Sequence, residues 1–123
     1  MTNQVSRENQ RLVHEPKVCA KFHGAIELIG RRWTGAIIYA LLQGPRRFCE
    51  FREAIPDLSD RLLTERLKDL EEHGIVDREV STGRPVQVIY RLTPKGRALE
   101  PILMAIADWG GAWADEDQPS ASV

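Results

Sequence analysis

The segment between Phe48 and Leu92 limits the possible folds of this chain most strongly, because helical and strand-like patterns follow one another closely there. From Ser59 to His73, leucines recur at three- and four-residue spacing, which is typical of an amphipathic helix. Ser59 is a good N-cap for this helix, and Gly74 is its expected C-terminal glycine. The segment is therefore organised around one well-delimited helix.

The sequence on either side of this helix completes the unit. A shorter helix is predicted from Phe48 to Ala54, closed by Pro56. After the long helix, alternation predicts strands from Ile75 to Val80 and from Val86 to Leu92, with a turn at Thr82-Gly83-Arg84-Pro85. This order is that of a winged helix-turn-helix, so the expected fold class is α+β, mostly α.

Further helices are expected on both sides of this unit. Apolar spacing predicts helices from Val18 to Ile29 and from Trp33 to Leu42. Thr93-Pro94 is a typical start for a last helix, in which Pro101 should bend or loosen the first turns. Its two tryptophans are too apolar to leave exposed in a monomer, which predicts a homodimer.

The long helix has an outer face with the chemistry of DNA recognition. At about 100° per residue, the leucines fall on one side and a polar group falls opposite. The outward residues are Arg61, Thr64, Glu65 and Lys68. The first three suit base edges, and Lys68 with Ser59 suits the phosphate backbone, although the same pattern also fits a face that is only solvated. Arg66 falls among the leucines and is interpreted as part of a structural ion pair.

Arginines also stand where loops meet helices or strands. Arg84 lies at the hairpin tip, where a wing would touch phosphate or the minor groove. Arg46 and Arg47 lead into the helix at Phe48, and Arg32 leads into the helix at Trp33. Helix N-termini bind phosphate through free N–H groups, so these arginines are further candidate DNA contacts.

Length and composition set the remaining limits. The 123 residues suit one domain, predicted at 17–114 between a flexible arm at 1–16 and an acidic flexible tail at 115–123. A net charge of −1 counts mildly against nucleic-acid binding, so the placement of charges must support it. No membrane-spanning run or secretory signal is evident, so we expect a cytoplasmic protein. No catalytic or metal-ligand motif appears, so we expect no enzyme, metal or cofactor.

From Cys19 to Trp113 the sequence resembles the HxlR family of bacterial winged-helix regulators. The blocks that carry the resemblance are Glu27-Leu28-Ile29-Gly30-Arg31-Arg32-Trp33-Thr34, Gly44-Pro45-Arg46-Arg47-Phe48, Ile55-Pro56-Asp57-Leu58-Ser59, Leu63-Thr64-Glu65-Arg66-Leu67-Lys68-Asp69-Leu70-Glu71, Gly74-Ile75-Val76, Pro85-Val86-Gln87-Val88-Ile89-Tyr90-Arg91-Leu92-Thr93-Pro94-Lys95-Gly96 and Trp109. The branch that looks most similar is the one that senses quinones and diamide.

The resemblance implies a homodimer that binds an inverted repeat in double-stranded promoter DNA, as a repressor. It implies dimerisation through the first and last helices. The residues expected at that interface are Phe22, Ile26, Ile106, Trp109 and Trp113. It also places Cys19 at the position of a cysteine that senses small electrophiles such as quinones. Two departures from the family pattern are Ala20, where proline is usual, and the absence of a cysteine from the last helix.

Chemistry leaves two interpretations of Cys19 open. A thiol at a helix N-terminus near Lys17 and Lys21 has more of the reactive thiolate form, but Cys19 also fits the apolar stripe as a small packed residue. Cys49, beside Phe48, is expected to be structural. Two alternative functions remain open: a ligand-responsive regulator without a cysteine switch, and a winged-helix interaction module that does not bind DNA.

Overall fold

The computed structural model describes residues 19–117. The predicted arm at 1–16 and Lys17 lie outside the described residues, as does the end of the predicted tail. The chain divides into two compact units, with the boundary between Thr34 and Gly35.

The first unit contains one helix and a turn. Helix α2 spans Ala20–Ile29, with Cys19 as its N-cap and Gly30 as its C-cap. Trp33 has a φ of 74°, in the left-handed region. A helix cannot contain that conformation, so the prediction of a helix beginning at Trp33 is wrong by one residue, and the next helix begins at Thr34.

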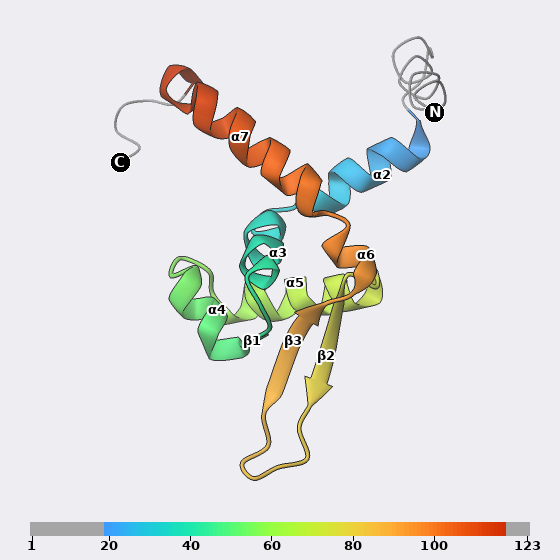
Figure 1. The fold of residues 1–123 in the computed structure, drawn as a ribbon, viewed down its shortest axis with the longest axis vertical. Coiled ribbons are helices and arrows are strands. Elements are labelled where there is room, and N and C mark those ends of the chain that lie inside the picture. Colours follow the sequence, from blue (N-terminus) through green and yellow to red (C-terminus); the bar gives the residue numbers. More distant parts are fainter. Residues whose placement is uncertain (1–18, 118–123) are drawn as a thin grey trace. The chain divides into compact units, whose positions relative to one another are not determined.

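The second unit holds the remaining elements (Figure 1). They are α3 (Thr34–Leu42), β1 (Arg46–Arg47), α4 (Phe48–Ala54), α5 (Asp60–Glu72), β2 (Val76–Val80), β3 (Val88–Leu92), α6 (Pro94–Arg97) and α7 (Glu100–Asp117). The three strands form an antiparallel sheet in the order β1-β3-β2. The sequence did not predict strand β1. Its Arg46 pairs with Tyr90 of β3. Figure 1 shows the β2–β3 hairpin projecting beyond α4 and α5 as a wing.

The core lies between α3, α4, α5 and the base of the sheet. Its fully buried side chains include Ile37, Ile38, Leu41, Phe51, Leu58, Leu63, Leu67, Leu70 and Val76. The rings of Phe51 and Tyr90 meet edge to face, with 6.1 Å between their centroids. Each such side chain contributes about 1.5–3 kcal/mol by leaving water, so this core fixes α5 and the hairpin in one body.

The predicted last helix is two helices. Thr93 caps α6 as expected, because its side-chain oxygen accepts a hydrogen bond from the backbone N–H of Gly96. The helix then breaks at Ala98 and Leu99, and α7 begins at Glu100 with Pro101 second. Proline has no N–H to donate and is tolerated only in a first turn, which explains the new start. Helix α7 runs to Asp117, past the predicted start of the tail at Asp115.

Candidate nucleic-acid interface

Helices α4 and α5 form the helix-turn-helix, and local bonds fix the turn between them. The N–H of Ile55 donates to Phe51 O at 2.8 Å, and the N–H of Leu58 donates to Ile55 O at 3.1 Å. The predicted cap is present, because Ser59 Oγ accepts from the N–H of Leu62 at 3.2 Å. An exposed ion pair also joins the helices, with 3.0 Å between Arg52 Nη1 and Asp60 Oδ1. The start of α5 is therefore held in a defined position.

The side chains of α5 divide as the spacing predicts. Leu63, Leu67 and Leu70 are buried, and Leu62 is half-buried. The candidate contacts on the opposite side are all exposed: Ser59, Arg61, Thr64, Glu65 and Lys68. Arg66 is half-buried and has a partner, which is compatible with the predicted structural role.

Two of the outward side chains on α5 hold one another. Arg61 Nε lies 3.3 Å from Glu65 Oε2, one helical turn away, and the side chain of Arg61 is 90% exposed. Thr64 Oγ1 donates to the Asp60 backbone oxygen at 2.8 Å, which leaves the hydroxyl able to accept a hydrogen bond. Arg61, Glu65 and Thr64 thus present a donor, an acceptor and a hydroxyl on one exposed face.

Hydrogen bonds between Ser81 and Gln87 hold the two sides of the wing together just before its terminal loop. Ser81 and Gln87 exchange two bonds: Ser81 N–H to Gln87 O at 2.8 Å, and Gln87 N–H to Ser81 Oγ at 2.9 Å. Arg84 lies exposed in the loop between them, as predicted. The predicted strand beginning at Val86 is wrong: β3 begins at Val88, and Val86 is 64% exposed, because the loop continues to Gln87.

The sequence interpretation missed one cation of the wing. Arg78 is exposed on β2, opposite Tyr90 in the register. Its position in a predicted wing strand was a signal that could have identified it. Arg91, on the adjacent strand β3, already forms an ion pair within the wing, with 2.7 Å between its Nη2 and Glu79 Oε1.

Arg46 and Arg47 have different environments although they are adjacent. The half-buried Arg46 donates from Nε to Ala40 O and from Nη2 to Gln43 Oε1, both at 2.9 Å. The guanidinium of Arg46 thus points back to α3, an orientation that the sequence did not predict. This orientation places Arg46 poorly for a contact with DNA phosphate. Arg47 is exposed and is the N-cap residue of α4.

Glu50 supports the start of α4. The backbone N–H of Arg47 donates to Glu50 Oε1 at 2.7 Å, and this bond holds the pKa of the Glu50 carboxyl below its ordinary value. The positive charges of Arg47 and Arg46 lower this pKa further. The ionised carboxylate therefore stabilises the first turn of the helix-turn-helix.

Arg32, in the first unit, stacks on its neighbour. Its guanidinium carbon lies 5.2 Å from the ring centroid of Trp33, the geometry of a cation–π contact. Arg32 remains exposed, so the predicted phosphate contact is neither favoured nor opposed by its position.

The two cysteines differ in how far they are buried, and the exposure of Cys49 was not expected. Cys19 is half-buried at the N-cap of α2, and its side chain makes no capping bond. Cys49 is exposed on α4, so the expectation that it is a packed structural thiol is wrong. Its neighbour Phe48 is only half-buried, because the inner face of this short helix is centred on Phe51.

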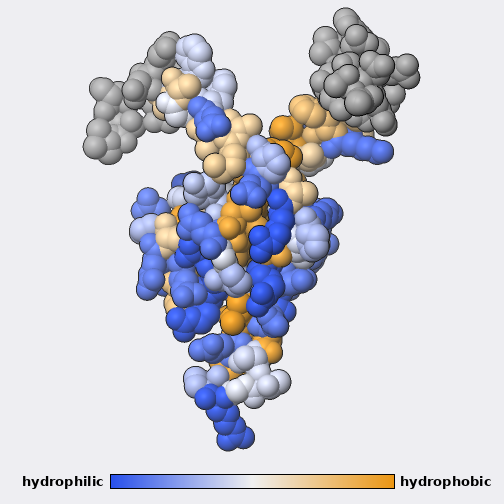
Figure 2. Space-filling model, in the orientation of Figure 1, coloured by the Kyte–Doolittle hydropathy of each residue, from blue (hydrophilic) through white to orange (hydrophobic). Residues whose placement is uncertain are grey.

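The residues predicted at a dimer interface are uncovered in a single chain. On α7, Ile106, Trp109 and Trp113 are 54%, 64% and 48% exposed. On α2, Phe22 and Ile26 are also exposed. Figure 2 shows mildly hydrophobic surface mixed with hydrophilic surface along α7, and mainly hydrophilic surface interrupted by hydrophobic patches over the helix-turn-helix and wing.

Within residues 19–117, no cluster of histidine, cysteine, aspartate or glutamate could hold a metal ion. No helix in that range is long and apolar enough to cross a membrane.

Comparison with known proteins gives consistent matches. Residues 28–118 match the family model described as HxlR-like helix-turn-helix. The HTH-type transcriptional regulator YodB of Bacillus subtilis (strain 168) is 46% identical over 99 residues, covering 80% of this chain and 85% of YodB.

Solved structures match the fold as well. The reduced form of YodB has a TM-score of 0.74 and 42% identity, covering 83% of this chain and 100% of that chain. The redox regulator HypR in its reduced form has a TM-score of 0.74 and 40% identity, covering 78% and 95%. Quinone-bound YodB has a TM-score of 0.67 and 42% identity, covering 76% and 99%. These likenesses confirm the predicted winged helix-turn-helix fold.

Proposed function

The chain belongs to the HxlR family of helix-turn-helix transcription regulators, and from this premise we propose that it is a repressor that binds an inverted-repeat operator as a homodimer. Its relatives are regulators, which confirms the prediction that it is not an enzyme. The observation that supports operator binding best is the exposed polar face of α5, fixed to the core by buried leucines on the opposite side.

In this proposal α5 enters the major groove. Arg61, Thr64 and Glu65 lie in the N-terminal half of α5, the part of a recognition helix that usually reaches base edges. An arginine donates to guanine, and a glutamate accepts from cytosine, so the two could read one base pair or two neighbours.

Phosphate contacts would set the position of α5 on the duplex. Lys68 makes no hydrogen bond or ion pair within the described part of the chain, so its ammonium is available to a phosphate. The residues assigned to the backbone are Ser59, Lys68, Arg47, Arg84 and Arg32. Arg46 is left out, because it is half-buried and its guanidinium points toward α3.

A homodimer follows from the uncovered apolar side chains of α2 and α7. Large exposed tryptophans are unusual in a monomer, and burying them against a second copy would gain stability. Two copies related by a two-fold axis would present two α5 helices, which read half-sites separated by about one helical turn, ~34–36 Å. That geometry requires an inverted repeat.

We further propose that a quinone releases the DNA by reacting at Cys19. HypR is a redox regulator and YodB has a quinone-bound form, which are properties of those proteins that motivate the proposal here. The Cys19 thiolate would add to a ring carbon, the electron pair would move to the ring oxygen, and that oxygen would take a proton. The half-buried position of Cys19 at a helix N-terminus suits a reactive thiol.

The deciding experiment is a titration of the reduced protein against DNA from its own upstream region and against a scrambled duplex, at one stated salt concentration. We expect tighter binding to the upstream region, by about 10³-fold or more for a specific site. Equal affinity for both duplexes would contradict operator recognition and favour an interaction module. Adding a quinone to the specific complex should then release the DNA.

A further inference from the structure

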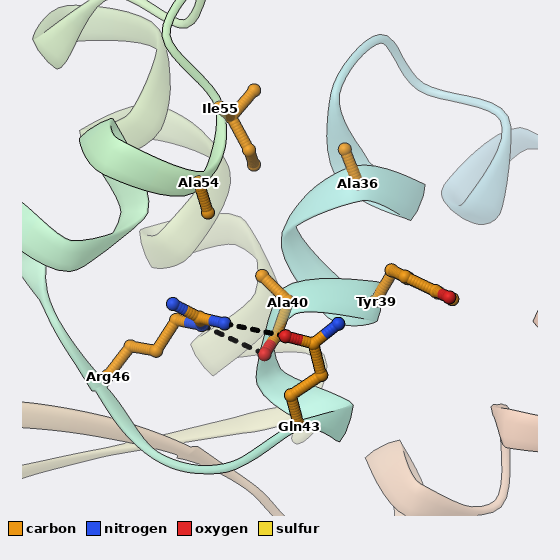
Figure 3. A pocket seen from close by; sticks show the side chains of 7 residues that line it. All are labelled: Ala36, Tyr39, Ala40, Gln43, Arg46, Ala54 and Ile55. Atoms are coloured by element: carbon orange, nitrogen blue, oxygen red, sulfur yellow. Dashed lines mark hydrogen bonds between the residues drawn. The ribbon is translucent and has the colours of Figure 1, made fainter.

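The second unit contains a cavity of about 360 Å³ between α3 and the end of α4. Its volume lies within the range of small-molecule sites, ~300–1,000 Å³. It is lined by Ala36, Tyr39, Ala40, Gln43, Arg46, Ala54 and Ile55 (Figure 3). The three alanines leave the space that larger side chains would fill.

One charged group faces this cavity, and its charge is not neutralised by a direct ion pair. Arg46 donates only to two neutral oxygens, Ala40 O and Gln43 Oε1. No carboxylate within residues 19–114 forms an ion pair with it: Glu50, whose pKa the charge of Arg46 helps to lower, pairs with Arg47 instead. A guanidinium has five N–H donors, so Arg46 has donors left for an anion.

Figure 3 shows how the cavity combines this charge with apolar walls. The guanidinium reaches from β1 toward Ala40 and Gln43, while Ala54 and Ile55 close the space from the α4 side. The ring of Tyr39 stands at the α3 side and is 44% exposed. A fully polar anion such as phosphate would leave the alanine and isoleucine surface unused. A carboxylate on a small apolar body would use both.

We propose that this cavity binds a small organic acid, whose carboxylate pairs with Arg46 and whose apolar body packs on Ala36, Ala54 and Ile55. The site is independent of Cys19 and of the DNA-binding face of α5. Because the acid would bridge α3 and α4, it would fix the first helix of the helix-turn-helix against the core. Ile55 both lines the cavity and begins the turn to α5, so occupancy is placed to affect DNA binding.

The test is calorimetric titration of the reduced, DNA-free protein with benzoate and hexanoate, and with benzamide and hexanamide as neutral counterparts. We expect the acids to bind and the amides to bind at least about 10-fold more weakly, because hydrogen bonds between charged groups are stronger than those to a neutral amide. Because no DNA is present, failure here is distinct from failure of the operator proposal.

Variants then locate the binding. Arg46→Gln should weaken the acids by at least about 10-fold. Ala54→Leu, which fills the space from an exposed position of α4 and leaves Arg46 intact, should abolish binding while thermal unfolding stays cooperative. Arg97→Gln removes an exposed arginine of α6 outside the cavity and should leave binding unchanged. The proposal is overturned if neither acid binds the unaltered protein, or if Ala54→Leu binds the acids as well as the unaltered protein.

Discussion

Arg61 and Glu65 lie one turn apart on the exposed face of α5, with 3.3 Å between Arg61 Nε and Glu65 Oε2. An exposed pair of this kind contributes little to stability, ~0.3–0.5 kcal/mol in a helix. Its importance is that each group orients the other before DNA arrives. In the proposed operator complex the pair would read DNA as one unit, so substitutions at the two positions should not be independent.

Arg61→Ala should lower affinity for the operator by about 1–3 kcal/mol and leave affinity for scrambled DNA nearly unchanged. Combining it with Glu65→Ala should cost less than the sum of the two single effects, because the interaction can be lost only once. Fluorescence anisotropy with both duplexes measures this. A uniform loss on both duplexes would assign Arg61 to phosphate instead of bases.

Arg84→Ala at the wing tip should weaken binding to every duplex alike. The plot of log K against log salt concentration should become shallower by about 0.9, the effect of one lost phosphate contact. Arg97→Ala, an exposed arginine outside the wing, is the matched control and should leave the slope unchanged. An unaltered slope in Arg84→Ala would remove the wing tip from the interface.

The sequence predicts the helix-turn-helix well because its signals are local. Helix α5 was bounded by a capping serine and a following glycine, and its leucines needed only the helical period to be placed inward. The same reasoning could not find strand β1, which has two residues and exists only because it pairs with Ile89 and Tyr90, far along the chain.

Other differences also come from contacts that lie outside a local pattern. The left-handed backbone at Trp33 excludes this residue from a helix, but no residue next to it in the sequence indicates that conformation. Arg46 looked like Arg47 in the sequence, but only the fold brings its guanidinium to the carbonyl oxygen of Ala40. Site residues on one regular helix can thus be predicted, whereas those at the junction of several elements cannot.

Removing an apolar side chain from the outer face of α7 should weaken the proposed dimer. Trp109→Ser deletes a large side chain that is 64% exposed in the single chain, so it should change association more than folding. Sedimentation across a concentration series should show a shift toward monomer. Asp108→Ala, also exposed on α7 but about 100° around the helix from Trp109, is the control and should remain dimeric. Unchanged association in Trp109→Ser would place the interface elsewhere.

The two cysteines provide a matched pair for the electrophile proposal. Cys19→Ser should bind the operator normally and resist release by a quinone, whereas Cys49→Ser should be released like the unaltered protein. Mass spectrometry of the treated protein would identify the adduct. Because Cys49 is exposed on α4, it is also open to reaction, so resistance in Cys49→Ser alone would transfer the sensing role to that residue.

Gly96→Ala should destabilise the winged-helix unit, because a Cβ at this buried position of α6 would overlap the backbone oxygen of Ile75 and press on Leu92. Overpacking of this kind typically costs about 1–3 kcal/mol. Gly111→Ala is the opposite case, since it is helical and a Cβ there meets nothing within 4 Å. It should be neutral or raise the free energy of unfolding by up to about 1 kcal/mol. Urea unfolding of both variants measures the difference. Equal stability of Gly96→Ala and the unaltered protein would show that α6 does not approach the first residues of the wing this closely.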